Sequence, residues 1–206
     1  MSKKQAPIST LQDYLPPGTY EPVLHYLQSY KVHLTVARER KSILGDYRHR
    51  TGVHTHRISV NGNLNQYSFL ITLLHELAHL LTFEKWGNKV ASHGKEWKGT
   101  FGGLLAQFIE HQTFPQDITT VLLQSLHNPA ASSCADEALL RTLKSYDEKS
   151  GASLFVESLP EGALFKTHDG RVFKKGEKMR KRFRCLEVAT KRLYLFSPVY
   201  EVEEIG

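Results

Sequence analysis

Residues 69–83 read FLITLLHELAHLLTF, and the placement of their few polar side chains decides how the chain is interpreted. Ten of these fifteen residues are apolar, as in a helix buried in a protein core. At about 100° per residue, the other five fall on one narrow stripe of that helix. They are Thr72, His75, Glu76, His79 and Thr82. Because an unpartnered buried ionisable group costs on the order of several kcal/mol, the stripe must face water, a hydrogen-bonded network or a metal.

The spacing of the polar residues favours a metal. His75 and His79 are four residues apart, so their imidazoles project from the same side of the helix and can share one tetrahedral Zn²⁺. Glu76, beside the first histidine, can act as a general base on water without itself binding the ion. The string H-E-x-x-H also arises by chance, but its place on the polar stripe of an apolar helix argues against an accident.

A catalytic zinc site with three protein ligands needs one more ligand downstream. The metzincin pattern is excluded, because Thr82 and Lys85 stand where it requires glycine and histidine. The first helix is predicted to end near Gly87, and a second helix to cover about residues 94–112. His93 would lie at the start of this second helix, on a short loop that returns toward the first. The alternative third ligands on the second helix are Glu96 and Glu110.

The run LLHELAHLL at 73–81, followed by SHGKEWK at 92–98, closely resembles the SprT family of zinc metallopeptidases. These are bacterial relatives of the Spartan and Wss proteases, which degrade proteins crosslinked to DNA. Two upstream segments, SILGDY at 42–47 and HRISVNGNL at 56–64, are also similar to the family, and the resemblance covers about residues 20–115. It implies protein substrates and one zinc ion per chain. The residues that it assigns are His75, His79 and His93 as zinc ligands and Glu76 as the general base.

The chain is predicted to have an α+β fold, with a zincin-like metalloprotease domain followed by a small β-rich module. The expected parts are an N-terminal tail at 1–18, the SprT-like domain at 19–149 and the module at 150–206. Besides the two helices of the metal motif, hydrophobic patterns predict helices at 19–30, 116–127 and 134–147 and strands at 32–39 and 56–61. An edge strand of this sheet would hold an extended protein substrate by backbone hydrogen bonds.

The C-terminal module departs from the family. Many bacterial SprT proteins end in a zinc ribbon built from paired cysteines, but this chain has only Cys134 and Cys185 and no C-x-x-C. A four-cysteine site is therefore impossible. We expect a ribbon-like β-module without metal, in which Cys185 is a core residue. Its expected strands are 153–159, 163–167, 171–175, 182–189 and 192–203.

Positive charge is concentrated in one segment of the module. Residues 171–192 hold ten Lys or Arg and two Glu, a net charge of +8, whereas the whole chain carries +6. Cations interleaved with Phe183 suit contact with the phosphates of DNA and stacking on its bases. The predicted nucleic-acid-binding residues are Lys174, Lys175, Lys178, Arg180, Lys181, Arg182 and Arg184. The alternative is a solvated charged hairpin with no nucleic-acid role.

Composition and the N-terminus indicate a cytoplasmic protein that does not enter a membrane. The chain has 206 residues, of which 40% are hydrophobic and 23% charged, as is ordinary for a globular protein. Residues 1–17 contain no apolar core of a signal peptide, and no run of 18 apolar residues is present. Two cysteines without a pairing pattern are typical of a reducing compartment.

Several other residues carry weaker signals. His54 and His56 alternate toward one face of a strand and could chelate an ion, but surface placement is the better interpretation. Tyr47 and Arg48 are candidates for holding substrate or polarising its carbonyl group. His111 is a candidate for contacting a metal ligand from the second helix.

Two functions of other classes compete with the peptidase. The first is a DNA-binding protein whose protease centre is vestigial, although a degenerate centre has no reason to keep Glu76. The second is a zinc hydrolase with a non-protein substrate, because H-E-x-x-H specifies water activation more than it specifies the substrate. A cleft open along an edge strand would favour the peptidase, and a closed small pocket would favour the other hydrolase.

Overall fold

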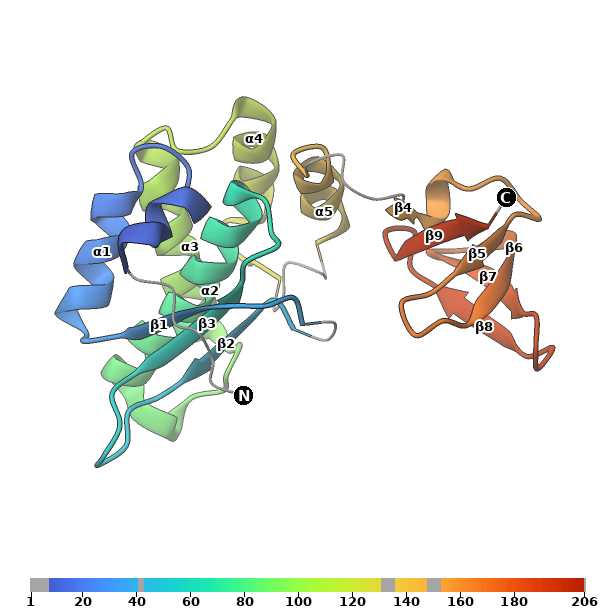
Figure 1. The fold of residues 1–206 in the computed structure, drawn as a ribbon. Helices are drawn as coiled ribbons and strands as arrows, with labels where there is room; N and C mark the ends of the chain where they lie inside the picture. The colour runs from blue at the N-terminus through green and yellow to red at the C-terminus, as the bar shows by residue number, and fades with distance from the viewer. Residues whose placement is uncertain (1–7, 41–42, 131–135, 148–152, 206) are drawn as a thin grey trace. The chain divides into compact units, whose positions relative to one another are not determined.

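The computed structural model describes residues 8–40, 43–130, 136–147 and 153–205. The chain divides into two compact units, Met1–Asp147 and Glu148–Gly206. The first unit combines helices with a three-stranded sheet, and the second is built around a six-stranded sheet (Figure 1). This mixture of helices and sheets confirms the predicted α+β class. Within the described ranges, no helix is long and apolar enough to cross a membrane.

The helices of the first unit follow the predicted pattern. The predictions at 19–30, 69–83, 94–112 and 116–127 correspond to four of them, with small differences at the ends. The predicted helix at 134–147 starts later, at Glu137, and residues 134–135 lie outside the described residues. The helical elements are η1 (Ile8–Tyr14), α1 (Tyr20–Ser29), α2 (Gln66–Trp86), η2 (Gly87–Lys89), α3 (Lys95–Glu110), α4 (Gln116–Ser125) and α5 (Glu137–Lys144).

The sheet of the first unit contains one strand more than predicted. Its order is β1-β3-β2, where β1 (His33–Ala37) and β3 (Arg57–Asn61) are the two expected strands. The unexpected strand is β2 (Gly45–Arg48), which pairs antiparallel with β3 at one edge. Its sequence, GDYR, begins with glycine and aspartate, which are depleted in strands, so the pattern carried little signal.

Helix α2, which carries the metal motif, is the centre of the first unit. It packs against α3 on one side and against β2 and β3 on the other (Figure 1). Asn65 starts the helix by accepting a hydrogen bond from the backbone N–H of Ser68 at 2.9 Å. Gly87 ends it with a φ of 60°, in the left-handed region that favours glycine. The helix is buried on almost every side, as its apolar composition predicts.

The second unit is an antiparallel sheet with the order β4-β9-β5-β6-β7-β8. The predicted strand at 153–159 is strand only to Phe155, and Val156–Ser158 form the short helix η4. The predicted strand at 192–203 is two strands, because Pro198 and a turn interrupt it. The strands are β4 (Ser153–Phe155), β5 (Leu164–Lys166), β6 (Val172–Met179), β7 (Arg182–Glu187), β8 (Leu193–Phe196) and β9 (Glu201–Ile205).

A small apolar core lies on one face of this sheet. Phe165, Phe173 and Phe196 pack together there, with ring centroids 4.9–5.6 Å apart. Cys185 is fully buried in the same core, as predicted, and behaves as a small apolar residue. The other cysteine, Cys134, lies outside the described residues.

Candidate metal centre

Three imidazoles converge where α2 meets the start of α3. His75 and His79 project from one side of α2, and His93 precedes Gly94, the N-cap of α3. The Nε2 atom of His75 lies 3.2 Å from Nε2 of His79 and 3.3 Å from Nε2 of His93. Among the described residues, these three form the group of side chains that could hold a metal ion. The structure thus brings together the three histidines that were predicted as ligands.

The geometry of this cluster fits a zinc ion. Zn–N bonds of about 2.0–2.1 Å at tetrahedral angles separate neighbouring ligand nitrogens by about 3.3–3.4 Å. Burial, together with the neighbouring imidazoles, lowers the pKa of His75 to about 3 and that of His79 to about 4. Burial and the charge of Lys98 also lower the pKa of His93. All three rings are therefore neutral at pH 7, the form that binds a metal.

Trp97, which was not predicted as a site residue, packs against all three imidazoles. Its ring centroid lies 4.7 Å from that of His75, 5.3 Å from that of His79 and 4.6 Å from that of His93. The side chain is fully buried, and its Nε1 has no hydrogen-bond partner within the described part of the chain. The sequence signal that could have indicated this role is the position of a large aromatic residue one helical turn after His93, within SHGKEWK.

Glu76 lies in the same cavity as His75 and His93 and is 6% exposed. Burial, and then the charge of Asp46, raises the pKa of Glu76 to about 8, against an opposing effect of Arg40. Strand β2 passes directly beside this carboxyl group. A Cβ atom at Gly45 would lie 2.9 Å from Cγ of Glu76 and closer still to its Oε1. The missing side chain at Gly45 therefore makes room for Glu76.

One edge of β2 is open beside the site, since no described strand pairs with it. The carbonyl of Leu44 accepts a hydrogen bond from the backbone N–H of Asn61, next to β3, at 2.9 Å. In an antiparallel pair, only every second residue directs its backbone N–H and C=O toward the partner strand. The backbone groups of Asp46 and Arg48 therefore point toward β3, as those of Leu44 do. The backbone groups of Gly45 and Tyr47 then point toward the open edge.

Tyr47 lies beside His79 and begins a hydrogen-bonded chain that runs through His56 to Glu84. Its ring is parallel to that of His79, with centroids 6.3 Å apart. The Tyr47 hydroxyl donates to Nδ1 of His56 at 2.9 Å, and Nε2 of His56 lies 3.2 Å from Oε1 of Glu84. Arg50 pairs with the same carboxylate at 3.2 Å. Burial raises the pKa of Tyr47 and lowers that of His56, so both groups are neutral at pH 7.

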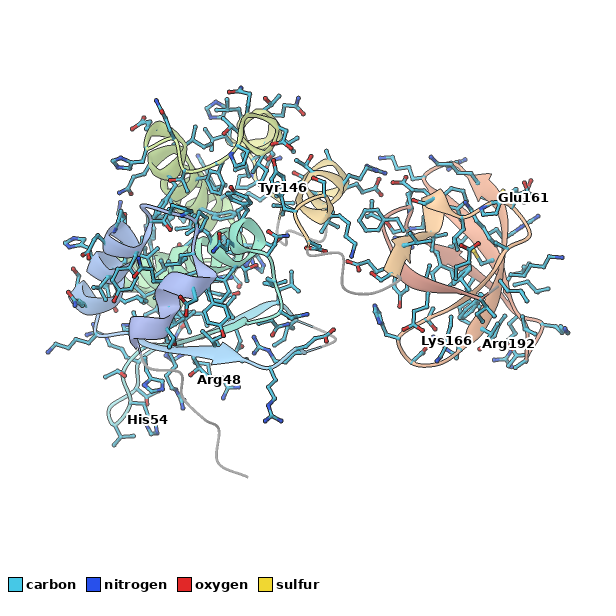
Figure 2. The ribbon with its side chains drawn as sticks, turned by 45° about the horizontal axis from the view of Figure 1, so that its top comes forward. Arg48, His54, Tyr146, Glu161, Lys166 and Arg192 are labelled. Atoms are coloured by element: carbon cyan, nitrogen blue, oxygen red, sulfur yellow. The ribbon has the colours of Figure 1, made fainter. Side chains whose placement is uncertain are left out.

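Surface placement was therefore the wrong prediction for His56, which is 3% exposed and hydrogen-bonded at both nitrogens. His54 and Arg48 are exposed (Figure 2), and Arg48 pairs with Asp46 at 2.9 Å. His111 and Glu110 are exposed at the end of α3. Neither alternative ligand, Glu96 or Glu110, belongs to the group that could hold a metal.

The predicted DNA-binding residues lie in the second unit, on and between β6 and β7. Lys175 is an exception to the predicted surface: it is buried, and its Nζ donates to the backbone carbonyls of Glu157 and Leu159. Lys175 therefore cannot contact a DNA phosphate, and we remove it from the predicted DNA-binding residues. Arg184 is exposed but forms an ion pair with Glu177. The other five are exposed: Lys174, Lys178, Arg180, Lys181 and Arg182.

The first unit is thus a mixed helix-and-sheet domain whose central helix contributes to a three-histidine cluster able to hold a metal ion. Residues 20–116, slightly less than half of the chain, match the SprT-like family. The match includes α1 to α3 and all three strands of the first sheet. No curated protein and no solved structure was found to match the chain. The match to this family suggests a metallopeptidase-type or DNA-associated function.

Proposed function

We propose that the chain is a zinc metalloendopeptidase with a zincin-like catalytic domain. His75, His79 and His93 hold one zinc ion, and Glu76 is the general base. The observation that carries the proposal is the convergence of three neutral imidazoles, with Nε2 of His75 at zinc-ligand spacing from the other two, beside the cavity that His75, His93 and Glu76 line. A buried carboxyl group beside such a cluster is typical of water activation and is costly as a purely structural element.

Each residue of the site has a distinct task. A divalent ion bound by the three imidazoles would act as a Lewis acid toward water and the scissile carbonyl, and its charge would favour ionised Glu76. Glu76 accepts a proton from water and returns it to the leaving amine. Gly45 leaves Glu76 the room to do so, and Trp97 fixes the three ligand rings by contact. The parallel stacking of Tyr47 limits rotation of the His79 ring.

The open edge of β2 favours a peptide substrate over a small molecule. An extended chain paired with this edge would use the backbone groups of Gly45 and Tyr47, and it would lie beside Glu76. Backbone pairing holds any sequence in extended form, so unfolded segments are the expected substrates. A vestigial centre would not explain why Gly45 leaves space for a buried carboxyl group.

Five of the exposed cations of the second unit, Lys174, Lys178, Arg180, Lys181 and Arg182, support DNA association. They extend along the β6–β7 hairpin, where phosphate contacts position a protein without reading bases. We propose that this module folds without metal and brings the catalytic domain to DNA-associated or DNA-crosslinked proteins. The match of residues 20–116 to the SprT-like family also supports this proposal.

The proposal is tested by incubating the zinc-loaded protein with an unfolded polypeptide and with a DNA-binding protein, each with and without DNA. Mass spectrometry of the products should show new peptide termini that disappear with a chelator. Addition of DNA should accelerate cleavage of the DNA-binding protein more than that of the unfolded polypeptide. Absence of cleavage in every zinc-loaded mixture would overturn the peptidase, and equal cleavage with and without DNA would overturn the DNA association.

A further inference from the structure

A cavity of about 330 Å³ extends from the candidate catalytic residues into the core of the first unit. Glu76 and His93 lie in its lining, while its inner walls are apolar side chains from three further helices. Phe101 and Leu105 come from α3, Leu122 from α4 and Leu139 from α5. These four side chains are at most 6% exposed, so the cavity reaches well below the surface.

The chemistry of the lining selects an apolar occupant. Among the described residues, no lysine or arginine lines it. Two of its polar residues already have partners: Asp136 accepts a hydrogen bond from the backbone N–H of Leu139 at 3.0 Å, and the Ser125 hydroxyl donates to the carbonyl of Leu122 at 3.4 Å. The other polar residues of the lining are Thr72, His75 and Glu76 on α2 and His93 just before α3. A polar side chain that entered among Phe101, Leu105, Leu122 and Leu139 would lose its water without gaining partners there. The volume is near the lower limit for ligand pockets and suits one large side chain.

The open edge of β2 leads to this cavity. Ile43 and Leu44, just before the strand, and Gly45, its first residue, line it together with Glu76. A substrate strand paired with β2 would therefore pass the mouth of the cavity while its backbone lies beside Glu76. Successive side chains of a strand point to opposite faces, so one residue near the scissile bond would point inward.

We propose that this cavity is a specificity pocket for a large apolar side chain, such as Leu or Phe, on the substrate residue that flanks the scissile bond. The proposal rests on the proposed peptidase function and names its substrate class. Segments that expose such side chains are those of unfolded or damaged proteins. Burial of one Leu or Phe side chain should favour its peptide about 10- to 100-fold over the alanine peptide.

The test begins with internally quenched peptides that differ only at the flanking residue, which is Leu, Phe, Ala, Asp or Lys. For the zinc-loaded protein, kcat/KM should be highest for Leu and Phe, by about 10- to 100-fold over Ala. Ser125→Phe fills the cavity and should reduce this ratio toward one. Ala130→Phe, at another lining position, should do the same if Ser125→Phe fails to fold. Leu123→Phe, on the exposed side of α4, is the matched control and should keep the ratio.

A binding measurement separates the pocket from catalysis. Fluorescence anisotropy with labelled Phe and Ala peptides is measured on the metal-free protein in chelator, where no hydrolysis occurs. A preference for Phe that Ser125→Phe removes and Leu123→Phe keeps would support the pocket, even if no peptide were ever cleaved. That combination would overturn the peptidase alone. Equal binding and equal cleavage of all peptides, or a preference that both filling variants keep, would overturn the pocket.

Discussion

Gly45 shows how a single missing side chain shapes the candidate site. It lies 31 positions before Glu76 in the sequence, yet its Cα faces that carboxyl group across the β2–α2 contact. H-E-x-x-H predicts the identity of the base but not what surrounds it, because the neighbours come from a strand with almost no strand signal. The same holds for Trp97, whose contacts with three histidines depend on how α3 packs on α2.

Gly45→Ala should impair catalysis more than folding. The new methyl group would displace the Glu76 carboxyl, and misplacement of a catalytic group by about 1 Å can cost about 10²-fold in rate. Overpacking should lower the free energy of unfolding by about 1–3 kcal/mol. Peptide cleavage and chemical denaturation measure the two effects. Gly52→Ala, where a Cβ meets nothing within 4 Å, is the control. Full activity of Gly45→Ala would show that the contact does not constrain Glu76.

The raised pKa of Glu76 predicts a pH dependence of stability in the metal-free protein. The folded state keeps this proton up to pH about 8, whereas the unfolded chain releases it near the ordinary value of 4.5. Folding therefore takes up a proton between these values, and the free energy of unfolding falls as the pH rises through this window. The loss should be on the order of a few kcal/mol at pH 9 relative to pH 5.

Urea denaturation in chelator, from pH 5 to 9, measures this dependence. Other groups titrate as well, so the informative quantity is the difference between wild type and Glu76→Gln, whose side chain cannot ionise. This difference should grow in favour of Glu76→Gln with rising pH. The exposed residue Glu110, changed to Gln, should follow the wild type. Parallel curves for wild type and Glu76→Gln would contradict the prediction.

At the scale of elements, long periodic segments were predictable and contacts between segments were not. The apolar periodicity of α2 and its end at Gly87 follow from local sequence. The run at 192–203 was wrongly predicted as one strand because apolar residues continue on both sides of Pro198. His56 was wrongly placed on the surface because its partners, Tyr47 and Glu84, are brought together only by tertiary packing.

Asn65 connects two elements that enclose the cavity. Its Oδ1 caps α2, while its Nδ2 donates to the carbonyl of Leu143 at 3.0 Å and to Oδ1 of Asp147 at 2.7 Å, at the end of α5. Asn65→Ala should lower the free energy of unfolding of the first unit by about 2 kcal/mol, about 1 from the cap and about 1 from the other bonds.

The two roles of Asn65 can be separated by Asn65→Ser. Serine keeps an N-cap acceptor but cannot reach α5, so its cost should be about half that of alanine. Denaturation followed by the helical circular dichroism signal of the full chain measures both variants. If serine were as destabilising as alanine, the cap would contribute nothing and the whole effect would come from α5.

At the scale of the whole molecule, the proposed catalytic centre and the proposed DNA-contact residues belong to different units. Composition already indicated this division, because the positive charge lies in the C-terminal segment and the metal motif lies in the first 100 residues. The distribution of charge did not, however, reveal which cations are buried. Lys175 is drawn into the module by two backbone carbonyls, which a run of lysines and arginines does not reveal.

DNA affinity should fall with salt, with a log–log slope of about −0.9 per phosphate contact on a duplex and about −0.7 on a single strand. Replacing Lys178, Arg180, Lys181 and Arg182 together by Ser should flatten this slope while zinc content stays near one per chain. The control replaces four exposed cations of the first unit, Arg38, Lys85, Lys89 and Lys95. If the replacement in the hairpin left DNA binding unchanged, or if the control replacement weakened binding equally, the β6–β7 hairpin would be a solvated surface with no DNA-binding role.

The most direct test compares zinc content and peptide cleavage in wild type, Glu76→Gln and His93→Ala. Wild type should bind about one zinc per chain and cleave an unfolded polypeptide. Glu76→Gln should keep that zinc and lose cleavage by at least about 10²-fold, because the base is gone while three imidazoles remain. His93→Ala should lose both. Full cleavage by Glu76→Gln, or full zinc content with full cleavage in His93→Ala, would contradict the assignment of these residues to a catalytic zinc centre.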